Sequence, residues 1–245
     1  MMKNNIIRVF PKYLWLLMLS YAVVIILANW VDARLVQFGP LITDGGTLIF
    51  PLTFVISDVI TEVYGYKHAR RAIWCGFLFN SVTIFFGLII SSLPSPDFAT
   101  NNDIFDQILA INFRITAAST LSYLISEPLN SLIMAKLKIK TAGKLMWLRF
   151  VFSTLLASGA DSFIFGTLAF YGTMSSHDLL MLIFGMWFIK VLIEVAGLPI
   201  SIPLSNKLKQ LEQLDMYDDK TNFNLLSLDG DYQTEANHFH QEIHQ

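Results

Sequence analysis

Charged residues are scarce in this sequence. Only 15% of its 245 residues are charged, whereas 54% are hydrophobic, and the mean hydropathy is +0.53. A soluble domain of this length needs more polar residues to cover its surface. The composition therefore excludes an ordinary soluble globule and predicts that most of the chain lies in lipid.

Cysteine and the common catalytic motifs are nearly or wholly missing. Cys75 is the one cysteine, which excludes an intrachain disulfide and a metal site built on several thiolates. The sequence contains no HExxH pair, no GxSxG elbow and no cysteine–histidine nucleophile arrangement. We expect a protein that is not an enzyme, with no catalytic residue, no metal site and no bound cofactor.

Long apolar runs are abundant instead. A helix needs about 20 apolar residues to cross a bilayer, and the runs 13–31 and 72–93 meet that length almost without charge. The first run is too long for a signal-peptide core and no small-x-small pattern follows it, so we expect it to be retained. We predict an all-α membrane protein, a bundle of six transmembrane helices over residues 13–31, 45–64, 72–93, 113–135, 149–171 and 179–206.

The basic residues indicate how the chain is oriented. With six spans, almost every Lys and Arg falls on one side, and only Arg34 and Arg114 fall on the other. The positive-inside rule then predicts a multi-pass membrane protein with both termini in the cytoplasm. We expect the transporter domain to cover residues 1–207. Residues 208–245 are polar and acidic, and we expect them to form a disordered cytoplasmic tail.

A few ionisable residues lie inside the predicted spans. Each costs about 2.5–3.5 kcal/mol at a helix centre, so each should face the bundle interior or water. Lys190 and Glu194 are four residues apart, which permits a local ion pair. For Glu62 an alternative interpretation is a solvated position at the membrane interface beside Arg70 and Arg71. The residues concerned are Asp58, Glu62, Glu127, Asp161, Lys190 and Glu194, with Arg149 at the cytoplasmic edge.

Carboxylates outnumber cations among these residues. An excess of acceptors suits a ligand that is rich in N–H donors or positively charged, and it also suits proton coupling. A guanine-like base offers neighbouring N–H donors to one carboxylate and a flat face to aromatic rings. A separate signal is the stripe Ser158, Ser162 and Gly166, which predicts close packing against another helix.

Several segments together resemble one family. The stretch "FPLTFVISDVITEVYGYKHARRAIWCGF", followed by "LISEPLNSLIMAKLK", "WLRFVFSTLLASGADSFIFGTLAFYG" and "WFIKVLIEVAGLPISIPLSNKLK", is similar to the bacterial queuosine precursor transporter family of the vitamin-uptake type. The resemblance implies a six-helix inner-membrane protein like the substrate-binding components of energy-coupling-factor transporters. It also implies import of 7-cyano-7-deazaguanine or its aminomethyl form for the queuosine modification of tRNA.

The matching motifs nominate site residues. They implicate Asp58 and Glu62 in the signature, Arg149 and Ser153 in "RFVFS", Asp161 in "GADSFIF", and Lys190 in the last span. Glu127 stands where the family has glutamine or another polar residue, and Glu194 is a candidate from its position in the membrane alone.

The expected partners are the lipid bilayer and a small 7-deazaguanine, with no nucleic acid. The Ala-xxx-Ala pattern that docks an ATPase module is absent from the first span, where Ala22 and Ala28 are six apart, which favours a protein acting alone. The alternatives are a substrate-binding component for another vitamin-like molecule and a membrane enzyme that uses its carboxylates for acid–base chemistry.

Overall fold

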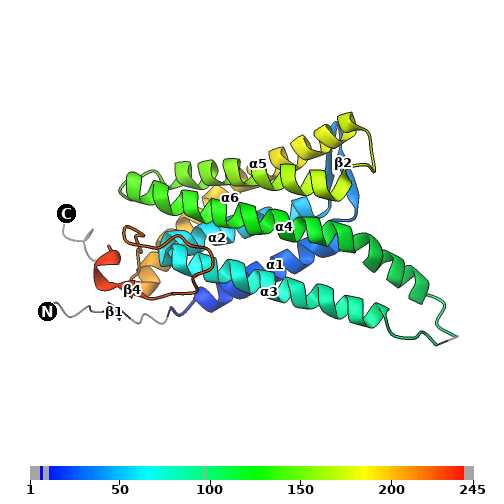
Figure 1. Ribbon diagram of the computed structural model, residues 1–245. Helices are drawn as coiled ribbons and strands as arrows, with labels where there is room; N and C mark the ends of the chain where they lie inside the picture. Colours follow the sequence, from blue (N-terminus) through cyan, green and yellow to red (C-terminus); the bar gives the residue numbers. More distant parts are fainter. Residues whose placement is uncertain (1–5, 8–10, 97, 240–245) are drawn as a thin grey trace.

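Six long helices form a bundle in the computed structural model, which describes residues 6–7, 11–96 and 98–239 (Figure 1). All six are long and apolar enough to cross a membrane, with α2 counted together with the short 3-10 turn η1 (Gly46–Leu48) before it. The prediction of a helical membrane bundle is therefore confirmed. The helices are α1 (Leu14–Val31), α2 (Pro51–Tyr64), α3 (Tyr66–Ser91), α4 (Asn102–Lys140), α5 (Met146–Phe170) and α6 (Ser176–Glu212).

Two helices are much longer than predicted. α4 has 39 residues and α6 has 37, which at 1.5 Å per residue is about 55 Å or more, against a hydrocarbon core of about 30 Å. Their ends therefore continue into segments that we expected to be loops. Ser175 caps α6, where its side chain accepts a hydrogen bond from the backbone N–H of Asp178 at 3.2 Å.

A β-hairpin between α1 and α2 was not predicted. Strand β2 (Leu35–Phe38) pairs antiparallel with β3 (Leu41–Asp44), so the fold is not purely helical. Gly39 begins the two-residue turn with φ of 58°, a backbone conformation that glycine adopts without strain. β3 packs on α6. In α6, Gly185 leaves room for the backbone of Ile42.

The two ends of the described chain meet at one end of the bundle. Strand β1 (Ile6–Ile7) pairs with β4 (Tyr232–Gln233), near the start of α3, whereas the β2–β3 hairpin lies at the opposite end (Figure 1). We call these two regions the termini end and the hairpin end. The arrangement agrees with termini on one side of a membrane, and which side that is stays a prediction.

The chain after α6 is packed in the structure, which differs from our expectation of a disordered tail. The guanidinium of Arg70 donates to the carbonyl oxygens of Asn222 (3.0 Å), Asn224 (2.7 Å) and Asp229 (3.0 Å). Trp74 donates from Nε1 to the carbonyl of Leu225 at 2.8 Å. The segment is therefore held by donors on α3, and Leu214, Met216 and Tyr232 anchor it in the main apolar core. These few apolar residues are scattered along a polar stretch, so its average composition gave no sign of structure.

The interior contains both apolar and polar contacts between helices. Tyr21, Phe54 and Tyr64 lie in the main apolar core, and Asn29 donates to Asn80 at 2.7 Å to join α1 to α3. The predicted packing stripe is confirmed at Gly166, which faces Ile183 and Met186 of α6.

Candidate functional site

Most of the buried charged residues form three groups along the bundle, and two others, Arg70 and Asp218, contact the chain after α6 or lie in it. The termini-end cluster contains Glu62, Lys138, Arg149, Lys209 and Asp215. The central cluster contains Asp58, Glu127 and Glu194. The hairpin-end cluster contains Asp32, Asp44, Asp161 and Lys190. The sequence-predicted residues are therefore divided among three places.

Glu62 is surrounded by cations in the termini-end cluster. Arg149 donates to both of its carboxylate oxygens, from Nε at 3.0 Å and from Nη2 at 2.7 Å. Lys209 Nζ lies 2.6 Å from Oε1, and Lys138 Nζ lies 3.8 Å from the same atom. The alternative of a solvated Glu62 beside Arg70 and Arg71 is therefore wrong, because Glu62 is fully buried.

The same cluster ties the chain after α6 to the bundle. Asp215 lies 2.7 Å from both Lys138 and Lys209. Lys138 also donates to the backbone carbonyls of Glu62 and Met216. Removing one member of such a buried network leaves an uncompensated charge, so the arrangement stabilises the fold. Sequence reasoning missed Lys138, Lys209 and Asp215 because they fell in segments interpreted as loop and tail.

The central cluster is different, because its carboxylates have few partners. Asp58, Glu127 and Glu194 are all 0% exposed. Asn130 donates to Oδ1 of Asp58 at 2.6 Å. Oδ2 of Asp58 and both carboxylate oxygens of Glu127 and Glu194 have no hydrogen-bond partner. Within the described part of the chain, no Lys or Arg forms an ion pair with any of the three.

Hydroxyl groups are the nearest polar neighbours of two of these carboxylates. Glu127 lies beside Tyr21, Thr53 and Ser57, and Glu194 lies beside Thr154. The hydroxyls of Tyr21 and Thr154 are buried and make no hydrogen bond in this conformation. The central cluster is thus a set of buried acceptors and donors that are close together but not paired.

Lys190 and Asp161 form the centre of the hairpin-end cluster. Lys190 Nζ lies 2.5 Å from Oδ2 of Asp161, whose Oδ1 accepts a hydrogen bond from Ser126 at 3.1 Å. The Lys190 ammonium also lies 5.1 Å from the centre of the Phe50 ring. The local pair that the spacing of Lys190 and Glu194 permits is not formed, since Lys190 pairs with α5 instead.

Two aspartates from outside the predicted spans complete this cluster. Asp44, the last residue of β3, accepts hydrogen bonds from the backbone N–H of Thr47 at 2.7 Å and from its hydroxyl at 2.6 Å. Asp32 follows α1 directly. Burial and the neighbouring carboxylate of Asp44 raise the pKa of Asp32 well above its usual range. Both aspartates flank the hairpin segment 33–43, and the Gly39-Pro40 turn signal within it could have indicated that they lie close together.

Ser153 belongs to none of the three clusters. Its hydroxyl donates to the carbonyl of Phe150 within α5 at 3.0 Å. Arg149 and Ser153 come from the same motif, but only Arg149 lies in a cluster.

The hairpin-end cluster surrounds a very small gap. It measures about 10 Å³ and is lined by the four charged residues together with the rings of Phe50 and Phe165 and three small hydroxyl residues. That volume holds at most one water molecule. The described conformation is therefore closed around these polar groups.

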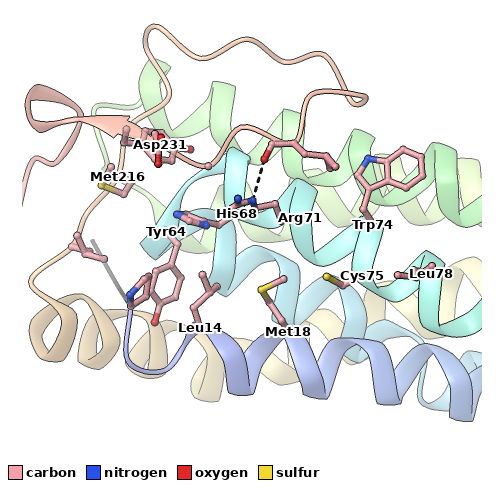
Figure 2. Close-up of a pocket in the computed structure, with 15 residues that line it drawn as sticks. Leu14, Met18, Tyr64, His68, Arg71, Trp74, Cys75, Leu78, Met216 and Asp231 are labelled. Carbon is pink, nitrogen blue, oxygen red and sulfur yellow. Dashed lines mark hydrogen bonds between the residues drawn. The ribbon is translucent and has the colours of Figure 1, made fainter. Parts of the chain in front are cut away.

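A larger cleft lies at the termini end (Figure 2). It measures about 610 Å³ and is lined by Pro11, α1, the end of α2, α3 and the chain after α6. Its lining is mainly apolar, with Leu14, Met18 and Leu78 among its residues, and Arg71 donates to the carbonyl of Leu228 at 3.1 Å. No member of the three clusters lines it, so its size alone does not make it the site.

Comparison with known proteins identifies the family. Residues 44–204 match the family described as "Putative vitamin uptake transporter". The chain belongs to this family. The matched range includes all of the central cluster and most of the other two, leaving out Asp32, Lys209 and Asp215.

Two relatives of this transporter carry the same printed name, "Probable queuosine precursor transporter". The one from Bacillus subtilis (strain 168) is 26% identical over 175 residues, which is 70% of this chain and 76% of the relative. The one from Haemophilus influenzae is 30% identical over 131 residues, about half of each chain. No solved structure matches. The resemblance to the queuosine precursor transporter family is confirmed, and its relatives are named as transporters and not as enzymes.

Proposed function

We propose that this transporter imports 7-deazaguanine precursors of queuosine across the bacterial inner membrane and binds them at the hairpin-end cluster. The names of its relatives support the substrate class. The observation that carries the proposal is the meeting of three aspartates, one lysine and two aromatic rings around a single gap.

The chemistry of the cluster complements a guanine-like base. Such a base presents two adjacent N–H donors on its pairing edge and a carbonyl oxygen beside them. A carboxylate accepts from both donors, and an ammonium donates to the carbonyl oxygen. Asp161 and Lys190, held 2.5 Å apart, offer these two functions side by side. Phe50 and Phe165 supply faces on which the flat ring can stack.

The charge balance also fits the aminomethyl precursor. Three carboxylates surround one ammonium in this cluster. The ammonium of an aminomethyl group would find an acceptor in Asp44 or Asp32 while the base occupies Asp161 and Lys190. The same cluster thus accommodates a neutral cyano precursor and a cationic one.

Binding requires the hairpin to move, because the gap of about 10 Å³ cannot hold a base. Asp44 lies at the end of β3, so displacement of the hairpin opens the gap and its return encloses the precursor. With the hairpin end facing the periplasm and the termini in the cytoplasm, this movement admits substrate from outside. The lack of an Ala-xxx-Ala pattern in the first helix supports a chain that works without an ATPase module.

The direct test is binding of 7-cyano-7-deazaguanine to the purified full chain in nanodiscs, measured by calorimetry. The informative variants are Asp44→Asn and the double substitution Asp161→Asn with Lys190→Met, which removes both charges of the pair and leaves neither unpaired. Loss of a buried charged hydrogen bond to ligand costs about 2–5 kcal/mol, so we expect affinity to fall by about 30-fold or more.

The matched control is Asp103→Asn, an exposed aspartate in the first turn of α4 that belongs to none of the clusters. It should bind like the intact chain. If the intact chain binds neither precursor but binds another vitamin-like molecule, the alternative reading of the family takes the place of this proposal. If the double variant binds normally, the site is elsewhere.

A further inference from the structure

The proposed binding site leaves the central cluster without a function. Asp58, Glu127 and Glu194 come from α2, α4 and α6, and each is 0% exposed. Ionised carboxylates in the membrane are stable only when they are paired or solvated. The described residues provide no cation for any of the three. They cannot all be ionised together in this conformation, so the cluster binds protons.

Two buried hydroxyls are placed to share those protons. Tyr21 of α1 lies beside Glu127, Thr154 of α5 lies beside Glu194, and neither hydroxyl has a hydrogen-bond partner. A protonated carboxyl group both donates and accepts, whereas an ionised one only accepts. A hydroxyl can rotate to satisfy either state, so these neighbours suit a carboxyl group that gains and loses a proton.

Among the described residues, the main electrostatic and hydrogen-bonding neighbours of the cluster include no Lys, Arg or His, and Lys190, one turn before Glu194 on α6, pairs with Asp161 instead. Asp58 faces Asn130, Glu127, Glu194 and Glu62. Glu127 faces Thr53 and Ser57 of α2 and Asp161 of α5, in addition to Tyr21 and the nearby Tyr123. The surroundings of the cluster are thus acidic or hydroxylic, which favours proton binding over an ion pair.

The carboxylates also form a series from one end of the bundle to the other. Asp161 of the hairpin-end cluster is an electrostatic neighbour of Glu127, which is a neighbour of Glu194. Glu194 is a neighbour of Asp58, and Asp58 is a neighbour of Glu62 in the termini-end cluster. Intramembrane carboxylates in such a series are typical of proton relays in transporters.

A metal ion fits the cluster less well than a proton. Within the described residues, no three His, Cys, Asp or Glu side chains are arranged to hold a metal ion.

We infer that Asp58, Glu127 and Glu194 form a proton-binding site through which import is coupled to proton entry. A proton arriving from the hairpin end binds a carboxylate of the cluster, moves with the substrate through the transport cycle and leaves at the termini end. The coupling rests on the proposed import function, whereas the binding of protons by these residues does not.

The first experiment tests proton binding without any substrate. Infrared spectra of the full chain in lipid vesicles are recorded between about pH 5 and pH 9, following the C=O stretching band of protonated carboxylic acids. We expect a band that persists near neutral pH, where exposed carboxylates are ionised, and that is weaker in Asp58→Asn, Glu127→Gln and Glu194→Gln. Glu235→Gln is the control, because Glu235 is exposed and pairs with Lys220 at the surface.

The second experiment tests coupling with 7-cyano-7-deazaguanine in the same vesicles. A pH gradient should drive accumulation of the precursor by the intact chain. The three variants should still exchange labelled precursor across the membrane at equal concentrations, but they should lose accumulation above the outside concentration. Accumulation equal to that of the intact chain in all three would overturn the coupling.

The two experiments separate the possible failures. A protonated band that is absent near neutral pH, or unchanged in every variant, overturns the proton site whatever the transport result. If the intact chain transports neither precursor, the proposed function fails, and the infrared result still decides whether the cluster binds protons.

Discussion

Glu62 and Glu127 are both fully buried glutamates, yet their surroundings are opposite. Three cations surround Glu62, and none pairs with Glu127. Glu62→Gln would leave Arg149, Lys138 and Lys209 without their shared anion, so we expect a loss of about 3–5 kcal/mol in the free energy of unfolding. Glu127→Gln removes no ion pair, and we expect a change within about 0.5 kcal/mol.

This pair of substitutions is measured by unfolding both variants beside the intact chain in the same detergent. The chemical change is the same in each, so each variant is a control for the other. Equal destabilisation of the two would contradict the assignment of Glu62 to a structural network and of Glu127 to a site without partners.

Asp32 makes the free energy of unfolding depend on pH. Its pKa is raised by burial and by Asp44, so the folded chain binds a proton at pH values where the unfolded chain does not. Its contribution to stability is present below the usual aspartate pKa of about 4 and declines as pH rises through the raised value. Asp32→Asn should therefore reduce the loss of stability between about pH 5 and pH 8.

The measurement for Asp32 is the unfolding midpoint of the intact chain and of Asp32→Asn across that pH range. Asp103→Asn serves as the comparison, since Asp103 is exposed. The prediction is wrong if the slopes of the intact chain and of Asp32→Asn are the same.

The sequence indicated which charged residues would be buried, but not which of them would form ion pairs with one another. The cost of charge in lipid made Asp58, Glu127, Asp161 and Glu194 candidates, and the structure buries all four. Pairing depends on the relative rotation of neighbouring helices, which spacing within one helix does not give. For this reason the pairing of Lys190 with Asp161, across two helices, could not be read from the sequence.

At the scale of elements, the position of the β2–β3 hairpin depends on a close contact between Gly185 of α6 and the backbone of Ile42. A methyl group on Gly185 would lie 2.1 Å from the carbonyl oxygen of Ile42, which is far inside contact distance. Gly185→Ala should push the hairpin from α6, cost about 1–3 kcal/mol of stability and weaken precursor binding. Gly197→Ala, in the same helix, is the matched control, because its new methyl group would lie 3.6 Å from Val55.

The hairpin prediction is checked by calorimetric binding and thermal unfolding of both glycine variants. Normal binding by Gly185→Ala would show that the hairpin position does not control the site.

Arg70 is one of the main contacts between α3 and the segment after α6. Arg70 donates to three backbone carbonyls of this segment, while the exposed Arg71 donates to one. Lysine lacks the planar set of donors needed to reach all three. Arg70→Lys should therefore raise the rate of protease cleavage within residues 218–231 several-fold, and Arg71→Lys should change it little. Equal cleavage in both variants would contradict this account of the segment.

The existence of each helix could be predicted because it depends on the length and apolar composition of a run. The ends of the helices and the irregular segments could not be predicted in this way. The extensions of α4 and α6 mix apolar residues with charged and amide residues, so they lack the continuous apolar run that marks a span. The packed segment after α6 is ordered by Arg70, Trp74 and Lys138 of other elements and by the burial of its few apolar residues against the bundle. Neither feature is visible in a local stretch of sequence.

At the scale of the whole molecule, the three clusters differ in their surroundings, and the functions that we propose for them differ accordingly. The hairpin-end cluster has the groups to bind a base, the central cluster has carboxylates without partners, and the termini-end cluster fixes the chain after α6. We therefore expect that charge neutralisation leaves stability nearly unchanged at the central cluster, destabilises the fold at the termini-end cluster and abolishes substrate recognition at the hairpin-end cluster.

The measurement that tests the central claim most directly is the queuosine content of tRNA. A bacterial strain that cannot make the precursors and lacks its own transporter is supplied with 7-cyano-7-deazaguanine or its aminomethyl form at low concentration. It carries either the intact chain or the Asp161→Asn and Lys190→Met double variant, with equal amounts verified in the membrane. We predict that queuosine returns with the intact chain and not with the double variant. Membrane-inserted intact chain that restores no queuosine with either precursor would contradict the account.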